Sequence, residues 1–327
     1  MCAGGKFLVV YFYLGGVMKT KNMLIKATMG ATAASFLASE YLFKMAFKRV
    51  EYVPETSEEK KKYAESYWEY VDWFQKSRKE HWFLKTKSET EKMSAWFIPA
   101  RDAASKKVVV ISHGYKGNGE TMANFAKMYY EMGFGVLLPD DRGHGESAGK
   151  YISFGWLDRL DYLEWLKKII EKMGKDIQIV LFGVSMGAST VAMLSGENVP
   201  VQVKCVIADC GYSSIEDELM FLLKRQFHLP KYPFYPLINT INHHRLGYYL
   251  GDVSTVTQLK KNKLPIFFIH GEEDDYVPSY MALENYRATD APKELWIVPK
   301  ATHAESYWMD PAVYKKHVQL FLDKYLN

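Results

Sequence analysis

The sequence contains few cysteines and none of the common metal-binding motifs. Cys2, Cys205 and Cys210 are the three cysteines among the 327 residues. Cys205 and Cys210 lie five residues apart on or just past one expected strand, so their side chains point to opposite faces and do not pair. Because CxxC and HExxH motifs and histidine-rich clusters are also absent, we expect neither a disulfide framework nor a bound metal.

An excess of charge of one sign is lacking as well. The chain has 42 Lys and Arg residues against 38 Asp and Glu residues, a formal net charge of +4. A nucleic-acid partner would require a clustered basic surface, which this balance does not predict. No Gly-Lys-Ser/Thr phosphate loop occurs, and Gly114, Gly117 and Gly119 follow the spacing GxxGxG in place of the dinucleotide pattern GxGxxG. We therefore expect no cofactor, and thermal stabilisation by NAD or ATP is the observation that would reverse this expectation.

The first fifty residues have no uncharged run long enough to span a bilayer. Phe7 to Met18 is uncharged but covers 12 residues, fewer than the roughly 20 of an ordinary transmembrane helix. A start at Met18 would place a lysine-containing stretch before an apolar segment, as in a signal sequence or anchor. Alternatively, Met23 to Phe47 forms an amphipathic helix that packs on the domain or lies on a membrane surface. We expect residues 1–50 to contact a membrane, and a cytoplasmic location is the open alternative.

Residues 51–327 show alternating strand and helix patterns. Val108 to Ser112 is a continuous β-branched run that is typical of a strand buried on both faces of a parallel sheet. Repeated strand–helix units predict a doubly wound, mostly parallel sheet with helices on both faces. The expected strands are His81–Lys87, Met93–Pro99, Val108–Ser112, Gly135–Leu138, Ile177–Phe182, Val203–Ala208, Pro265–Ile269 and Glu294–Val298.

The alternation breaks at about residues 211–263. Ile215–Phe227 and Leu237–Leu250 have helical patterns, and the segment Leu229–Pro236 between them is rich in proline and aromatic residues. An insertion beyond the carboxyl end of the Val203–Ala208 strand lies over the ligand crevice of such a sheet. We therefore predict a helical lid, with a peripheral helical connection as the alternative.

The pattern Gly183-Val-Ser-Met-Gly187 lies between an expected strand and a helix-compatible segment from Ala188 to Leu194. GxSxG in this context is the nucleophile elbow, a turn so sharp that the serine hydroxyl projects clear of the sheet. A side chain at either glycine would collide with neighbouring backbone at the turn. The pattern predicts Ser185 as a nucleophile.

A base and an acid follow in the order that this architecture uses. Asp274 lies in the loop after the Pro265–Ile269 strand, and His303 lies in the loop after the last expected strand. A serine hydroxyl is a poor nucleophile at neutral pH, so His303 must take its proton while Asp274 fixes the imidazole tautomer. The alternatives for the acid are Asp275 and Asp209.

An oxyanion hole requires two preorganised backbone N–H groups. We expect one from Met186, directly after the nucleophile, and one from Tyr115, because Gly114 lets the chain turn sharply before it. Three further histidines, His113, His144 and His270, each precede a glycine in a loop. We expect them to shape these turns by hydrogen bonding.

Five motifs together resemble the α/β-hydrolase superfamily, and they are most similar to bacterial serine hydrolases that include esterases and serine aminopeptidase-like members. They are His113-Gly114, Asp141-Arg-Gly-His-Gly-Glu-Ser147, Gly183–Gly187, His270-Gly-x-x-Asp274-x-x-Val-Pro278 and His303-Ala-x-Ser-Tyr307. The resemblance covers Phe97 to the C-terminus and implies the same triad. The oxyanion loop reads His-Gly-Tyr where lipases have a glycine run, so the resemblance does not imply a bulky ester.

The leading hypothesis is a serine hydrolase that cleaves a carboxylic ester, or a related thioester or amide, of a small-molecule acyl substrate through an acyl-enzyme. Serine aminopeptidase-like or acyltransferase activity on the same triad is the alternative. A membrane-tethered binding module without turnover is a third hypothesis, which failure of a fluorophosphonate probe to label the protein would favour. The sequence predicts neither the acyl and leaving groups nor the oligomeric state.

Overall fold

The computed structural model describes residues 26, 29–30, 32–50, 63–85 and 92–326. Within them, one eight-stranded sheet has the order β1-β2-β4-β3-β5-β6-β7-β8, in which β1 and β2 are antiparallel to their neighbours and β3 to β8 are parallel. All eight predicted strands are present, within two residues of their predicted bounds. They are β1 Glu80–Lys85, β2 Lys92–Ile98, β3 Lys107–Ser112, β4 Gly135–Pro139, β5 Gln178–Val184, β6 Val203–Asp209, β7 Ile266–Gly271 and β8 Lys293–Val298.

The parallel part of the sheet is buried on both faces. Successive residues of β3 enter two different apolar clusters: Val109 and Ile111 belong to one, and Val108 and Val110 to the other. The first cluster packs under α3 (Ala64–Lys76), α4 (Ala123–Glu131) and α12 (Pro311–Leu322). The second packs under α5 (Asp158–Met173), α6 (Met186–Leu194) and α10 (Tyr280–Ala288). This two-sided burial explains the continuous β-branched run in the sequence and confirms the predicted fold class.

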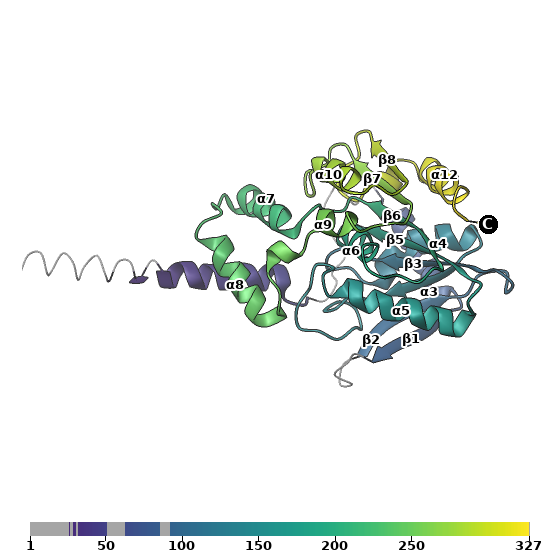
Figure 1. Ribbon diagram of the computed structural model, residues 1–327, viewed down its shortest axis with the longest axis horizontal. Coiled ribbons are helices and arrows are strands. Elements are labelled where there is room, and N and C mark those ends of the chain that lie inside the picture. Colours follow the sequence, from purple (N-terminus) through teal and green to yellow (C-terminus); the bar gives the residue numbers. More distant parts are fainter. Residues whose placement is uncertain (1–25, 27–28, 31, 51–62, 86–91, 327) are drawn as a thin grey trace, which may run out of the picture.

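The insertion between β6 and β7 forms a helical cap, which we define as residues 211–263. It contains α7 (Ile215–Phe227), α8 (Phe234–Leu246), the short 3-10 helix η2 (Leu250–Asp252) and α9 (Thr255–Leu259). Its first two helices project away from the sheet (Figure 1).

The second cap helix begins and ends earlier than predicted, at Phe234 and Leu246. Pro233 and Pro236 do not prevent this start, because a proline in the first turn removes an N–H that has no intrahelical acceptor. Gly247, in the left-handed region at φ 81°, ends the helix.

Residues 32–47 form a helix whose last turns pack against the cap. Phe43 and Phe47 are fully buried and their rings stack, with centroids 4.5 Å apart. They belong to one apolar cluster with Ile238 and Ile241 of α8. This part of the N-terminal segment therefore lies beside the cap, as the packed-helix alternative predicts.

The uncharged run Phe7–Met18 lies outside the described residues. The two possible first residues, Met1 and Met18, and the stretch in which a signal sequence would begin lie outside them as well. Among the helices that the structure does describe, none combines the length and the apolar content required to cross a bilayer.

Candidate active site

The serine of the GxSxG motif lies at the junction of β5 and α6. Ser185 has φ 57° and ψ −120°, a conformation that an L residue adopts only where the surrounding structure enforces it. A Cβ atom at Gly183 would lie 2.2 Å from the Gly187 carbonyl oxygen, and one at Gly187 would lie 2.2 Å from that of Ser112. Both positions therefore require glycine, which is the physical reason for the motif.

Three side chains from separate loops form one hydrogen-bonded chain. Ser185 Oγ lies 2.8 Å from His303 Nε2, and His303 Nδ1 lies 2.8 Å from Asp274 Oδ2. Their loops follow β5, β8 and β7, whose carboxyl ends meet at one edge of the parallel sheet. An ionised carboxylate only accepts hydrogen bonds, so His303 carries its proton on Nδ1 and offers the Nε2 lone pair to the serine hydroxyl. The arrangement suits proton abstraction from Ser185.

Asp274 is buried but remains ionised. Its Oδ1 accepts the backbone N–H groups of Tyr276 and Val277, at 3.0 and 2.9 Å. Burial alone would raise the pKa of Asp274, but hydrogen bonds from His270 and His303 outweigh it and hold the pKa below its usual value. His270 also donates from Nε2 to the Val277 carbonyl oxygen at 2.9 Å, so it shapes this turn as predicted.

The two alternative acids are engaged elsewhere, and in the described part of the chain neither hydrogen-bonds to His303. Asp275 is exposed and pairs with Arg225 of α7. The buried Asp209 carboxylate accepts hydrogen bonds from Ser306 Oγ at 3.2 Å and the Tyr314 hydroxyl at 2.9 Å. Burial raises the pKa of Asp209 to about 6. Its backbone carbonyl accepts the Ser185 N–H at 2.8 Å, so Asp209 supports the elbow through its main chain.

The two amides predicted for the oxyanion hole flank the serine. Met186 is the first residue of α6, and the loop that carries Tyr115 passes beside Ser185, since a Cβ atom on Gly114 would lie 3.5 Å from the Ser185 Cβ. Among the described hydrogen bonds, neither the Met186 nor the Tyr115 N–H has an acceptor. Both amides are therefore available to an oxyanion.

His113 connects the beginning of the candidate oxyanion loop, residues 113–119, to the loop after β4 through hydrogen bonds. Its Nδ1 donates to the Gly114 carbonyl oxygen at 2.8 Å, and its Nε2 accepts the Asp141 N–H at 3.0 Å. The ring must be neutral to accept, and burial lowers the pKa of His113 in agreement with this requirement. Its predicted turn-shaping role is confirmed.

His144 makes a similar pair of hydrogen bonds, and one of them is to Lys116, the residue after Tyr115. Its Nδ1 donates to the Arg142 carbonyl oxygen at 3.0 Å, and its Nε2 accepts the Lys116 N–H at 3.1 Å. Lys116 has a φ of 60°, so this bond holds a residue in the left-handed region next to the candidate oxyanion amide. Burial holds the pKa of His144 well below its usual value, which keeps the ring neutral.

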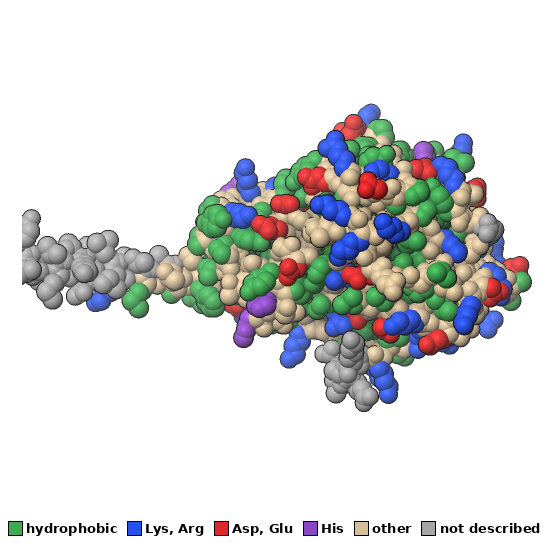
Figure 2. Space-filling view, in the orientation of Figure 1, with side chains coloured by type: hydrophobic (Ala, Val, Ile, Leu, Met, Phe, Trp, Pro, Cys, Tyr) green, Lys and Arg blue, Asp and Glu red, His purple; other side chains and the backbone are tan. Residues whose placement is uncertain are grey.

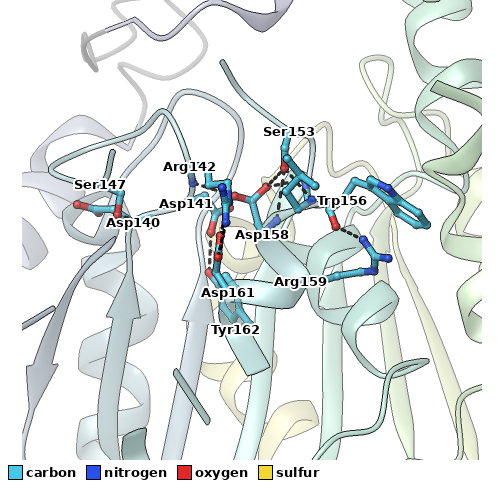
Figure 3. A network of polar contacts seen from close by, with 12 residues as sticks. Asp140, Asp141, Arg142, Ser147, Ser153, Trp156, Asp158, Arg159, Asp161 and Tyr162 are labelled. Atoms are coloured by element: carbon cyan, nitrogen blue, oxygen red, sulfur yellow. Dashed lines mark hydrogen bonds and ion pairs between the residues drawn. The ribbon is translucent and has the colours of Figure 1, made fainter. Parts of the chain in front are cut away.

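A carboxylate network supports the loop that carries His144, and Figure 3 shows it. Asp161 of α5 binds the Arg142 guanidinium through two hydrogen bonds of 2.5 and 2.7 Å. Asp158 accepts the Arg142 N–H at 2.8 Å, and the Tyr162 hydroxyl donates to Asp141 Oδ1 at 2.8 Å. This network is not predicted above from the sequence. The sequence feature that indicates it is the i, i+3, i+4 spacing of Asp158, Asp161 and Tyr162, which places the three side chains on one face of α5.

The cap contributes one buried carboxyl group near the triad. Glu218 of α7 is 4% exposed, and neither of its carboxyl oxygens has a hydrogen-bond partner among the described residues. Burial, together with the negative charge of Asp274, raises the pKa of Glu218 to about 8. Near neutral pH this group is therefore mainly protonated.

One set of described residues has the donor types of a metal site. The Sγ of Cys210 and ligand atoms of Asp274 and His303 lie within 4.8 Å of one another. Burial, with the nearby Asp209 and Asp274 carboxylates, holds the pKa of Cys210 well above its usual value, so in the metal-free protein the sulfur is a thiol. The His303 imidazole and the Asp274 carboxylate already hydrogen-bond to each other. Their arrangement therefore fits the triad better than a metal site.

Comparisons with known proteins agree with this architecture. The family model described as serine aminopeptidase, S33, matches residues 103–229. A Bacillus subtilis protein called YqkD is 31% identical over 215 residues, which cover 66% of this chain and 70% of YqkD. The Schizosaccharomyces pombe protein bem46 is 22% identical over 228 residues, which cover 68% of this chain and 70% of bem46.

Solved structures show the same fold. The esterase PF2001 of Pyrococcus furiosus matches with a TM-score of 0.65 at 22% identity, covering 86% of this chain and 99% of the esterase. The acylaminoacyl peptidase of Pyrococcus horikoshii matches with a TM-score of 0.53 at 20% identity, covering 76% of this chain and 42% of the peptidase. The chain belongs to the α/β-hydrolase superfamily and is of the serine-hydrolase type within it.

Proposed function

We propose that the protein hydrolyses carboxylic esters through a covalent acyl-enzyme formed on Ser185. The observation that carries the proposal is the hydrogen-bonded chain from Ser185 through His303 to Asp274, with both links at 2.8 Å. This geometry is that of a nucleophile, a general base and a group that orients the base. It forms although the three residues come from three separate loops.

In the first half-reaction, Ser185 Oγ attacks the ester carbonyl carbon and its proton passes to His303 Nε2. The carbonyl oxygen takes the negative charge, and the amides of Met186 and Tyr115 stabilise it. When the tetrahedral intermediate collapses, the bond to the leaving oxygen breaks, and His303 returns the proton to that oxygen. The products are an alcohol and an acyl-Ser185 ester.

In the second half-reaction, a water molecule donates its proton to His303 and attacks the acyl carbon. The new intermediate collapses with Ser185 as the leaving group, which regains a proton from His303. The products are a carboxylic acid and the free enzyme. Throughout the cycle, Asp274 stays ionised and balances the charge of the imidazolium.

Two alternatives use the same triad. The match to the serine aminopeptidase family favours cleavage of an aminoacyl amide, and an acyltransferase would transfer the acyl group to an alcohol in place of water. The likeness to an esterase supports ester cleavage, and we rank it first. A binding module without turnover is disfavoured because all three triad members are present and in contact.

A substrate panel tests the proposal. Purified full-length protein is assayed with p-nitrophenyl esters of increasing chain length and with aminoacyl p-nitroanilides, in the presence and absence of a small alcohol. We expect ester turnover that Ser185→Ala abolishes. Faster turnover of the anilides would favour the aminopeptidase, and transfer to the alcohol would favour the acyltransferase. Failure of every substrate, together with no labelling by a fluorophosphonate, would contradict the proposal.

A further inference from the structure

The helix formed by residues 32–47 is apolar on two sides, and the cap covers only one of them. Leu42, Phe43 and Phe47 are buried against the cap. Leu37, Tyr41 and Met45 are spaced four residues apart and therefore form one stripe along the helix, and they are 67, 66 and 36% exposed. Because they are exposed, these side chains contribute little buried apolar area to the described part of the fold.

The tip of the cap carries a further exposed aromatic side chain. Tyr232, in the connection between α7 and α8, is 71% exposed. Phe36, closer to the beginning of the helix, is 49% exposed. The helix leaves the body at the end where α7 and α8 project (Figure 1), and hydrophobic side chains gather at that end in the space-filling view (Figure 2). We call Phe36, Leu37, Tyr41, Met45 and Tyr232 the docking face.

Four exposed lysines lie on the N-terminal helix and near the tip of the cap, and two of them, Lys44 and Lys231, are in ion pairs. Lys44 and Lys48 lie on or directly after the helix, Lys224 lies on α7, and Lys231 lies in the connection directly before Tyr232, all exposed. Of the acidic groups nearby, Glu40 is paired with Arg245 and Lys44, and Glu216 is paired with Lys231. Exposed aromatic and apolar side chains bordered by lysines are typical of a surface that binds at the headgroup level of a bilayer.

The same charges argue against a second copy of the chain as the occupant. A symmetric dimer through the docking face would bring the lysines of both copies together, and like charges across an interface cost free energy. Anionic lipid headgroups would instead attract these lysines while the apolar side chains enter the acyl region. The preceding sequence fits this arrangement, since residues 7–18 are uncharged and Lys19 and Lys21 follow them.

We propose that the docking face binds an anionic lipid surface, so that the protein draws its acyl substrate from that surface. The apolar cluster under the docking face contains Phe43 and Phe47, and it continues to Met186, directly after Ser185. Apolar packing is therefore continuous from the helix that carries the docking face to the residue after Ser185. The statement about the substrate rests on the proposed esterase function, whereas the docking itself does not.

Vesicle flotation tests the docking without requiring turnover. Full-length protein carrying Ser185→Ala is mixed with phosphatidylcholine vesicles that contain or lack phosphatidylserine, and the bound fraction is measured. We expect binding that increases with phosphatidylserine and weakens in high salt. The triple variant Leu37→Ser, Tyr41→Ser and Tyr232→Ser should bind at least about tenfold more weakly, because each change removes apolar area that the bilayer would cover.

Val201→Ser is the matched control. Val201 is an apolar residue with 82% exposure, and it lies just before β6, at the opposite end of the strand from the cap. Thermal melting of the triple variant checks that it is folded. Unchanged binding of the triple variant would overturn the proposal, as would absence of vesicle binding by the parent protein. A dimer that forms in solution and that the triple variant abolishes, without vesicle binding, would identify a second copy as the occupant.

The substrate part has its own readout. With Ser185 intact, the triple variant should hydrolyse a short soluble ester at the parental rate but a vesicle-embedded ester at least about tenfold more slowly. Equal rates on the embedded ester would overturn the substrate statement. If flotation behaves as expected while no ester is hydrolysed by the parent protein, the proposed esterase function fails and the docking stands.

Discussion

The Tyr115 hydroxyl donates a hydrogen bond to the Ala46 carbonyl oxygen at 2.7 Å, across 69 residues of sequence. Ala46 belongs to the last turn of the N-terminal helix, and Tyr115 supplies one of the two candidate oxyanion amides. The Tyr115 ring also stacks on Phe154, with centroids 5.4 Å apart. The segment that carries the proposed docking face is therefore in direct contact with the loop that holds this candidate oxyanion amide.

Removing this contact should affect the rate more than substrate affinity. Tyr115→Phe keeps the backbone amide and the ring but leaves the Ala46 carbonyl without its donor, which costs about 1 kcal/mol of stability. A looser loop aligns the amide less well, so we expect kcat to fall roughly threefold to tenfold with little change in KM. Steady-state kinetics and thermal melting measure the two effects. Tyr325→Phe, near the C-terminus, is the control, and an equal loss of kcat in both variants would contradict this role.

His144 should act through the same loop. His144→Ala leaves the Lys116 N–H without its acceptor. Complete removal of one oxyanion donor lowers kcat by about 10²–10³-fold. We expect a tenfold to hundredfold loss in kcat, since the Tyr115 amide itself remains. His144→Gln provides an amide oxygen that can accept the bond and should recover part of the loss. Active-site titration separates a slower enzyme from a smaller folded fraction, and a loss in active fraction alone would contradict the positioning role.

Glu218 should make the protein less stable as the pH rises. Its pKa is about 8 in the folded protein against an ordinary value of 4.5 for a glutamate, so between these values the folded state binds more protons than the unfolded state. The free energy of unfolding therefore decreases with rising pH across this window, by up to about 1.4 kcal/mol per pH unit from this group. Glu218→Gln stays neutral and should remove this contribution.

Denaturant unfolding of the parent protein and Glu218→Gln at pH 5, 6, 7 and 8 measures the effect. We expect the stability advantage of the variant to grow with each step, because other groups that titrate are common to both proteins. Glu284→Gln, which changes an exposed glutamate on α10, is the control. A stability difference that does not depend on pH would show that Glu218 is ionised in the folded protein.

The sequence predicts the strands and the positions of Ser185, Asp274 and His303 because these depend on local patterns. A β-branched run predicts a buried strand, and the carboxyl ends of parallel strands share one edge, so the loops after them converge. The glycines at 183 and 187 are required by contacts within the turn and with the neighbouring strand. Local chemistry is sufficient for this part of the site.

Other features depend on contacts between distant segments and have no local signal. The bond from His144 to Lys116 spans 28 residues, and whether a histidine before a glycine accepts from a particular amide depends on how two loops meet. The position of β4 between β2 and β3 is likewise a matter of chain crossover. The apolar residues Phe43 and Phe47 indicate burial but do not specify the cap as their partner.

Covalent labelling tests the central claim, that Ser185 is the nucleophile, most directly. The parent protein is incubated with a fluorophosphonate, and intact-mass and peptide mass spectrometry then locate the adduct. We expect one adduct on Ser185, none in Ser185→Ala, and labelling slowed by roughly 10³-fold or more in His303→Ala, since the base is lost. Labelling that persists in Ser185→Ala, or an adduct on another residue, would contradict the account.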